Sequence, residues 1–183
     1  MSLESDVAGI LRNDPVGRIH FSIEAASVNK MRMEFVAKAI DAREVAVKSG
    51  TTGSLLGAAY SSFKSRRFAE GEKKIAGEIT VGSQATLRPL GRASIFHESV
   101  HALIDVKGPT LSMHNDEVIA YLADAMYLRA TKTTVAGGAL ETAIFNAAFA
   151  IVDKHQLLTR HNVKLKWTDC DALRDAIKAH PAY

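Results

Sequence analysis

The sequence has 183 residues, of which 47% are hydrophobic, and its formal net charge is +3. This is the length of one domain, and the apolar content is enough for a packed core, which excludes a disordered chain. The small net charge argues against a dedicated nucleic-acid-binding protein. The single cysteine, Cys170, excludes an intramolecular disulfide and lies in a polar run that predicts a solvated or semi-buried thiol.

The start of the chain predicts helices. Residues 1–14 fit a short amphipathic helix or a loose arm, and they are too polar and acidic for a secretory leader. A turn follows at Asp14 to Gly17, and apolar residues then recur at helical spacing from Ile19 to Ala42. We therefore expect a helix over residues 19–42, in a protein that is cytoplasmic or exported without a cleaved signal peptide.

Three short β-rich segments come next, at Glu44–Val47, Ala58–Phe63 and Ile75–Gly82. Turn residues bound them, so they predict a small antiparallel sheet. A basic run between the last two segments predicts a solvated hairpin arm; its members are Lys64, Arg66, Arg67, Lys73 and Lys74.

Two helices with clear ends follow the sheet. The first has Thr86 as a candidate N-cap and Pro89 in its first turn, and it is expected to end at Gly108-Pro109. The second is expected to begin near Ser112 or Asn115, which places Glu117 in its first turn. A 16-residue separation between His101 and Glu117 lets the chain turn and the second helix return alongside the first.

The C-terminal part is mostly helical. A third helix over residues 135–155 is apolar on nearly every face, so it either lies in the core or packs on a second copy of the chain in a homo-oligomer. Glu141 and Asn146 near its middle argue against a membrane span. A strand-like piece at 163–167 and a helix at 170–179 complete a single α+β domain over residues 1–183.

The sequence Ser94 to Asp105 contains H-E-x-x-H. On a helix, His97 and His101 lie one above the other and point two imidazoles at one place, as a zinc ion requires. Glu98 is about 100° further round the helix. It is a poor ligand from there, but it can take a proton from a water molecule at the metal as a general base.

A third ligand is needed, and Glu117, His114 and Asp116 are the candidates. With Glu117 in that role, the sequence resembles the gluzincins, zinc peptidases with H-E-x-x-H on one helix and a glutamate ligand on a later one. The resemblance covers about residues 77–130. It implies His97, His101 and Glu117 as zinc ligands and Glu98 as general base.

The resemblance also implies a zincin-like core over about residues 44–130 with helical flanks. The strand before the motif helix, about Glu78 to Gly82, would border the cleft and pair with an extended peptide substrate. We therefore expect a zinc-dependent metallopeptidase, a hydrolase that acts on peptides or proteins, with no membrane partner and no nucleic acid.

The sequence departs from the thermolysin-like subgroup. The position one turn after Glu117 is Tyr121 instead of a carboxylate, and the next carboxylate on that face is Asp124. Asp105, one turn after His101, is a further candidate partner for a ligand imidazole. The metzincin pattern is excluded, because no glycine and third histidine follow His101 at the required spacing.

Other parts of the site stay open at this level. Tyr121, Tyr127 and His114 are the candidates for a donor to the oxyanion. Two rival functions also remain. In one, the same ligands hold a structural zinc in a non-catalytic binding module. In the other, the motif is accidental and the chain is a helical protein-interaction module.

Overall fold

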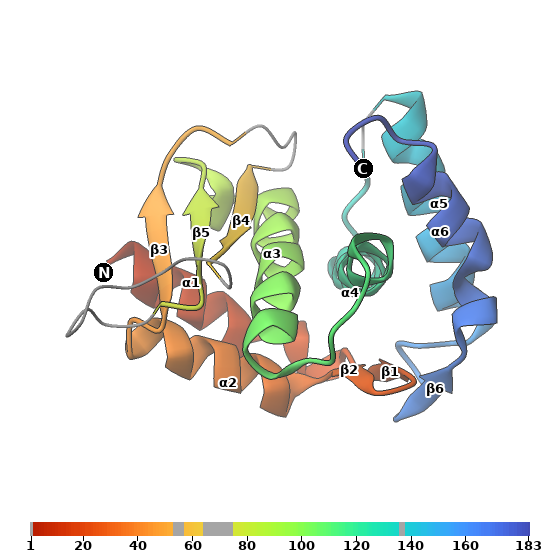
Figure 1. Ribbon diagram of the computed structural model, residues 1–183, viewed down its shortest axis with the longest axis horizontal. Coiled ribbons are helices and arrows are strands. Elements are labelled where there is room, and N and C mark those ends of the chain that lie inside the picture. Colours follow the sequence, from red (N-terminus) through yellow and green to blue (C-terminus); the bar gives the residue numbers. More distant parts are fainter. Residues whose placement is uncertain (1, 53–56, 64–74, 136–137) are drawn as a thin grey trace.

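A computed structural model describes residues 2–52, 57–63, 75–135 and 138–183 of the chain. Within these ranges it contains six α-helices and two three-stranded sheets (Figure 1). The α+β class expected from the sequence is therefore confirmed. The basic run at residues 64–74 lies outside the described residues.

The larger sheet has the strand order β3-β5-β4, formed by β3 (Val45–Ser49), β4 (Ala58–Ser62) and β5 (Gly77–Val81). All three strands were expected, but the antiparallel pairing was wrong in part. β5 is antiparallel to β4 and parallel to β3. β5 is therefore the central strand, because it pairs with both neighbours, and β4 is an edge strand.

Helices α1 (Leu3–Arg12) and α2 (Lys30–Asp41) pack against each other and against β3. Each begins at a polar cap: the side chain of Ser2 accepts a hydrogen bond from the Ser5 amide, and Asn29 accepts one from Arg32. Val7, Ala8 and Leu11 form the buried face of α1. The N-terminal segment is therefore an integral helix of the core and not a loose arm.

The single helix expected over residues 19–42 was wrong in its first half. Strands β1 (Phe21–Ile23) and β2 (Ala26–Val28) form an antiparallel hairpin there, and β6 (Val163–Leu165) adds to β1 in parallel. Phe21, Ile23, Ala26 and Val28 are buried while Ser22 and Ser27 are partly exposed, which is the period-two pattern of a strand. The short spacing of these apolar residues also fits a helix, and that ambiguity caused the error.

The two central helices are α3 (Pro89–Lys107) and α4 (Met113–Thr131). Proline at the first position suits the start of α3, and Gly108 caps its end as expected, although the N-cap is Arg88 and not Thr86. Thr86 instead belongs to the short helix η2 (Ala85–Leu87). Ser112 caps α4 through a hydrogen bond from the Asn115 amide, so Glu117 lies just after the first turn.

Two more helices cover the far side of α4. They are α5 (Ala139–Lys154) and α6 (Asp171–Lys178), which follows the short helix η3 (Trp167–Cys170). α5 packs against α4 and α6 through buried residues that include Ile144, Phe145 and Ile151. The homo-oligomer expected through this helix stays a prediction.

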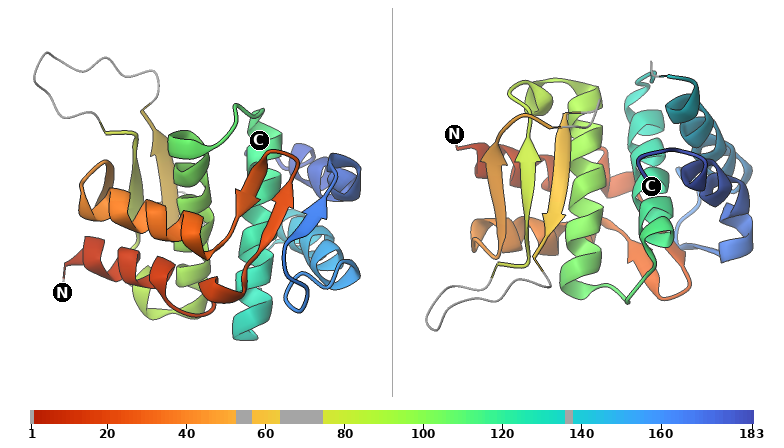
Figure 2. Two further views of the ribbon diagram at one scale, coloured as in Figure 1. Left: turned by 90° about the horizontal axis from the view of Figure 1, so that it is seen from below. Right: turned by 45° about the horizontal axis from the view of Figure 1, so that its top comes forward.

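The pair α3–α4 joins two parts of the molecule. α3 packs against β4, β5, α1 and α2 on one side, whereas α4 packs against α5 and α6 on the other. The buried side chains, from Val7 in α1 to Ile177 in α6, form one hydrophobic core. Figure 2 shows α3 beside the sheet, α4 next to it, and the end of the chain beside α4. None of the described helices combines the length and hydropathy needed to cross a lipid bilayer.

Candidate metal centre

The motif histidines and Glu117 meet at the interface between α3 and α4. His97 and His101 are one turn apart on α3, and their Nε2 atoms are 3.2 Å from each other. The carboxylate of Glu117 reaches from α4 to within 3.5 Å of His97 Nε2 and 3.6 Å of His101 Nε2. Among the described residues, these three side chains form the group of potential metal ligands whose donor atoms lie within 4.8 Å of one another.

These distances fit a tetrahedral zinc ion. Zinc–nitrogen distances of 2.0–2.1 Å require ligand atoms about 3.3 Å apart along each edge of the tetrahedron. The three observed separations, 3.2, 3.5 and 3.6 Å, are close to one triangular face of such a tetrahedron. Oxygen Oε2 of Glu117 is buried without a hydrogen-bond partner among the described residues, as expected for an atom that a cation would satisfy.

Each histidine also turns its other ring nitrogen toward a carboxylate. His101 Nδ1 is 2.9 Å from Asp116 Oδ1, which is a hydrogen bond. His97 Nδ1 is 3.8 Å from Asp124 Oδ2, and neither atom has a hydrogen-bond partner elsewhere in the described part of the chain. A carboxylate behind a ligand imidazole fixes the orientation of the ring and raises its basicity.

Burial and charge together set the proton affinities of this cluster. Burial alone would lower the pKa of His97, but its contact with Glu117 and the charges of Glu98 and Asp124 raise it to about 9. Burial raises the pKa of Asp124 to about 7, against the opposing charge of His97. Burial would also raise the pKa of Glu117, yet the two imidazoles lower it overall. The carboxylates thus surround a position that favours positive charge.

Glu98 lies next to the ligand group but does not belong to it. Its Oε2 accepts a hydrogen bond of 2.8 Å from the backbone amide of Tyr60 in β4. Burial raises the pKa of Glu98, although the imidazoles of His97 and His101 act in the opposite direction. A carboxylate with a raised pKa that is held by one oxygen is suited to accept a proton near neutral pH.

A cleft of about 210 Å³ opens beside these residues, lined by Tyr60, Ser62, Glu98, His101, Asp105, Met113, Asp116 and Glu117. The strand at its edge is β4. We expected the strand at Glu78–Gly82 to border the cleft, and this was wrong. That segment is β5, which is paired on both sides and therefore lies in the middle of the sheet.

Several residues that the sequence suggested as parts of the metal site lie in positions other than those expected. Asp105 does not pair with a ligand imidazole; it accepts a 3.0 Å hydrogen bond from the hydroxyl of Tyr60. His114 is absent from both the described ligand group and the residues lining the cleft. Tyr121 does reach the site, because its ring packs edge-on against His97 with 4.7 Å between centroids.

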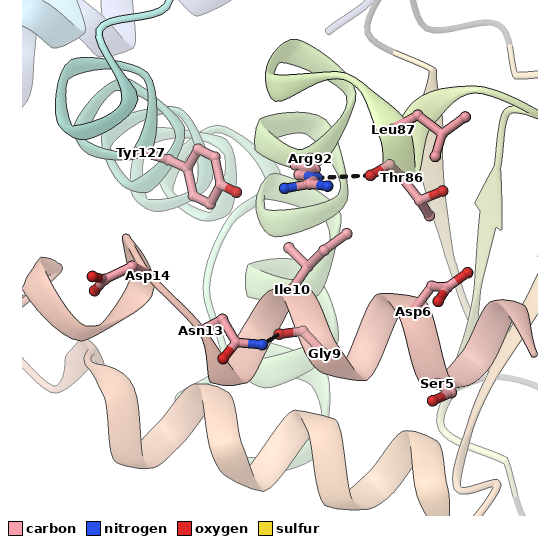
Figure 3. A pocket seen from close by; sticks show the side chains of 10 residues that line it. All are labelled: Ser5, Asp6, Gly9, Ile10, Asn13, Asp14, Thr86, Leu87, Arg92 and Tyr127. Carbon is pink, nitrogen blue, oxygen red and sulfur yellow. Dashed lines mark hydrogen bonds between the residues drawn. The ribbon is translucent and has the colours of Figure 1, made fainter. Parts of the chain in front are cut away.

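Tyr127 faces a different pocket. Figure 3 shows it pointing from α4 toward Arg92 of α3 and toward Ile10 of α1. This second pocket has a volume of about 300 Å³ and contains none of the three potential metal ligands. Tyr127 is therefore in the wrong place to donate to an oxyanion at the histidine site.

Two further contributions to the site were not expected from the sequence. One is the Tyr60 amide that holds Glu98, and the other is Tyr183, whose hydroxyl is 2.9 Å from that of Tyr121. Both depend on contacts between residues far apart in the chain, for which no local motif exists. Cys170 also differs from expectation: it is fully buried, and burial raises the pKa of its thiol to about 11.

A scan against protein-family models, a search of curated proteins and a search of solved structures each found no match to this chain. The chemistry of the site therefore has to be inferred from its own residues.

Proposed function

We propose that the protein is a zinc-dependent metallopeptidase with a zincin-like arrangement of the gluzincin kind. His97, His101 and Glu117 are the zinc ligands and Glu98 is the general base. The observation that carries this proposal is the different placement of the histidines and of Glu98 on one turn of α3. Two imidazoles converge with Glu117 at zinc-like separations, while the adjacent Glu98 stays outside the ligand group and lines the open cleft.

A zinc ion in this position would activate a water molecule as a nucleophile and polarise the carbonyl group of a substrate. Glu98 accepts the proton of the attacking water and passes it to the leaving amine. The Tyr60 amide holds one oxygen of Glu98 by its hydrogen bond, which fixes the direction in which the carboxylate points. Asp116 holds the His101 imidazole in orientation by a hydrogen bond from behind, and Asp124 faces the corresponding nitrogen of His97 at 3.8 Å.

The substrate would be an extended peptide that lies along the edge strand β4. Tyr60 and Ser62 of this strand line the cleft together with Glu98. Edge strands bind extended peptides through backbone hydrogen bonds. Since the Tyr60 amide is already engaged by Glu98, a peptide on this edge passes directly beside the general base.

A structural zinc site is the alternative to consider, because the same three ligands could serve it. Structural zinc ions have four protein ligands and a closed coordination shell. Here the potential ligands His101 and Glu117 line an open cleft, and the described residues supply three ligands in the group. This arrangement favours catalysis over a structural role.

The first experiment measures the metal. Protein purified without chelator is analysed for metal content, and its zinc affinity is measured by competition with a chelator. We expect about one zinc per chain and losses of at least about tenfold for His97→Ala, His101→Ala and Glu117→Ala. His114→Ala is the matched control and should bind like the parent. Absence of any bound transition metal, even after zinc is added, would contradict the proposal.

The second experiment tests the chemistry. Glu98→Gln keeps the shape of the side chain and its acceptor oxygen for the Tyr60 amide, but it removes the proton acceptor. It should retain zinc and lose hydrolysis of a peptide library by about two to four orders of magnitude. Hydrolysis at the parent rate would exclude Glu98 as the base. Loss of zinc would instead make it a ligand.

A further inference from the structure

Tyr60 is hydrogen-bonded to α3 at two points. Its backbone amide donates a bond of 2.8 Å to Glu98 Oε2, and its side-chain hydroxyl donates one of 3.0 Å to Asp105 Oδ2. Glu98 and Asp105 are about two helical turns apart on α3, so they lie on the same face of the helix. Strand β4 packs beside this helix (Figure 1). One residue of the edge strand therefore connects the proposed general base to a second carboxylate.

The pairing of the strands explains why the Tyr60 amide is available to Glu98. β4 and β5 are antiparallel, with Tyr60 opposite Ile79. In the same ladder the Phe63 amide donates to the carbonyl of Ala76, so the backbone groups of Phe63 face the β5 side. Backbone groups alternate between the two sides along an antiparallel strand. Those of Tyr60 therefore point away from β5, to the open edge of the sheet.

The ring of Tyr60 has a restricted place as well. Gly77 in β5 leaves the space that this ring occupies, because a side chain at that position would overlap the ring and its hydroxyl. A tyrosine side chain has only two torsions. Packing of the ring over Gly77, together with the bond from the hydroxyl to Asp105, therefore restricts the backbone of Tyr60 and the direction of its amide.

We propose that Asp105 and the Tyr60 hydroxyl position the general base. Asp105 holds the hydroxyl, the hydroxyl fixes the backbone of Tyr60, and the Tyr60 amide holds one oxygen of Glu98. This inference rests on the proposed function, since it requires Glu98 to accept a proton. Proton transfer needs the base within about 2.6–3.2 Å of the water oxygen, so a small displacement of Glu98 slows the reaction.

The test uses the zinc-loaded protein and one peptide that the parent hydrolyses. Tyr60→Phe and Asp105→Ala remove the same hydrogen bond from its two ends. Each should lower kcat by about tenfold and leave KM and zinc affinity near the parent values. The double variant should match the single ones, because both remove one interaction. Asp105→Asn keeps an acceptor oxygen and should lose less than Asp105→Ala. Tyr127→Phe, at the second pocket (Figure 3), is the control and should retain the parent kcat.

The Glu98→Gln background shows whether the effect passes through the base. With the proton acceptor removed, adding Tyr60→Phe should cause no further loss of kcat. An equal loss in that background would overturn the inference, because Tyr60 would then act on something other than Glu98. Weaker zinc binding, a change in KM alone, or a parent-like kcat in Tyr60→Phe would overturn it too. If the parent hydrolyses no peptide, or Glu98→Gln is as fast as the parent, the proposed function fails and the inference fails with it.

Discussion

Asp124 is fully buried, and neither of its side-chain oxygens has a hydrogen-bond partner among the described residues. Burying a carboxylate without compensation is costly, so such a group marks either a charge partner or a function. Within the described part of the chain its charge partner is His97 Nδ1 at 3.8 Å, on the side of the ring opposite the proposed metal position. The burial of this carboxylate without a hydrogen-bond partner is thus explained if His97 binds a cation through Nε2.

We predict that Asp124→Asn weakens zinc binding about tenfold or more, because the amide keeps the shape but no longer supports the imidazole with a negative charge. The control is Asp153→Asn, which removes an exposed carboxylate that pairs with Arg129 on the surface. Competition with a chelator measures both variants. Equal affinities in Asp124→Asn and the control would show that the buried carboxylate does not act through His97.

Cys170 gives a prediction about pH. Its thiol is fully buried, and burial raises its pKa to about 11. The thiolate is the reactive form, so at pH 8 the folded protein holds this group almost entirely as unreactive thiol. We expect slow labelling by a thiol reagent at pH 8 and rapid labelling after unfolding in denaturant. Fast labelling of the folded protein at pH 8 would place the thiol at the surface.

Among the elements, the start of α3 depends on close packing at Gly91. A side chain there would overlap the backbone of Ala85 in η2. Gly9 in α1 is the natural comparison, because nothing lies within 4 Å of the place its side chain would occupy. Both positions have the same glycine helix propensity. Any difference between the effects of alanine at the two positions on the free energy of unfolding therefore reports the packing around them.

We predict opposite signs for alanine at these positions. Gly9→Ala should raise the free energy of unfolding by about 0.5–1 kcal/mol through helix propensity. Gly91→Ala gains the same propensity, but it must displace backbone and should lower the free energy of unfolding by about 1–3 kcal/mol. Unfolding in urea measures both. Stabilisation by Gly91→Ala would mean that η2 can move away from α3 at little cost.

The sequence predicted elements where the signal is local. Pro89 and Gly108 mark the ends of α3, and helical spacing alone places Glu117, Tyr121 and Asp124 on one side of α4, where all three contact His97. The predictions from the sequence failed where strands pair with segments far away in the chain. Whether β5 is an edge strand or a central strand depends on its pairing with β3, and the sequence of β5 alone does not indicate that pairing.

The same distinction applies to the site. The positions of the two histidines and Glu98 follow from one turn of helix. Glu117 was one of three candidates for the third ligand, and the structure groups it with the two histidines while it places Asp116 behind His101. Tyr183 is 62 residues from Tyr121, and nothing in its neighbourhood indicates a functional role. Only tertiary packing brings it to Tyr121, which packs against His97.

At the scale of the whole molecule, the proposed metal lies where the two parts of the fold meet. Two ligands come from α3, which packs against the β3-β5-β4 sheet, α1 and α2. The third comes from α4, which packs against α5 and α6. A metal bound by all three joins the sheet side to the helical side. The same interface buries His97 and Asp124 and partly buries His101, Glu98 and Glu117.

We therefore predict that zinc stabilises the entire fold and not only the cleft. At a free zinc concentration 100 times the dissociation constant, the gain is about 2.7 kcal/mol, which corresponds to about 5–11 °C in melting temperature for a domain of this size. Calorimetry with zinc and with a chelator measures the difference. The variant His97→Ala/His101→Ala is the control, because it keeps the other histidines while losing the site. An equal shift in parent and control would trace the effect to zinc on surface histidines. A shift confined to the parent, in a single transition, requires that α3 and α4 unfold together.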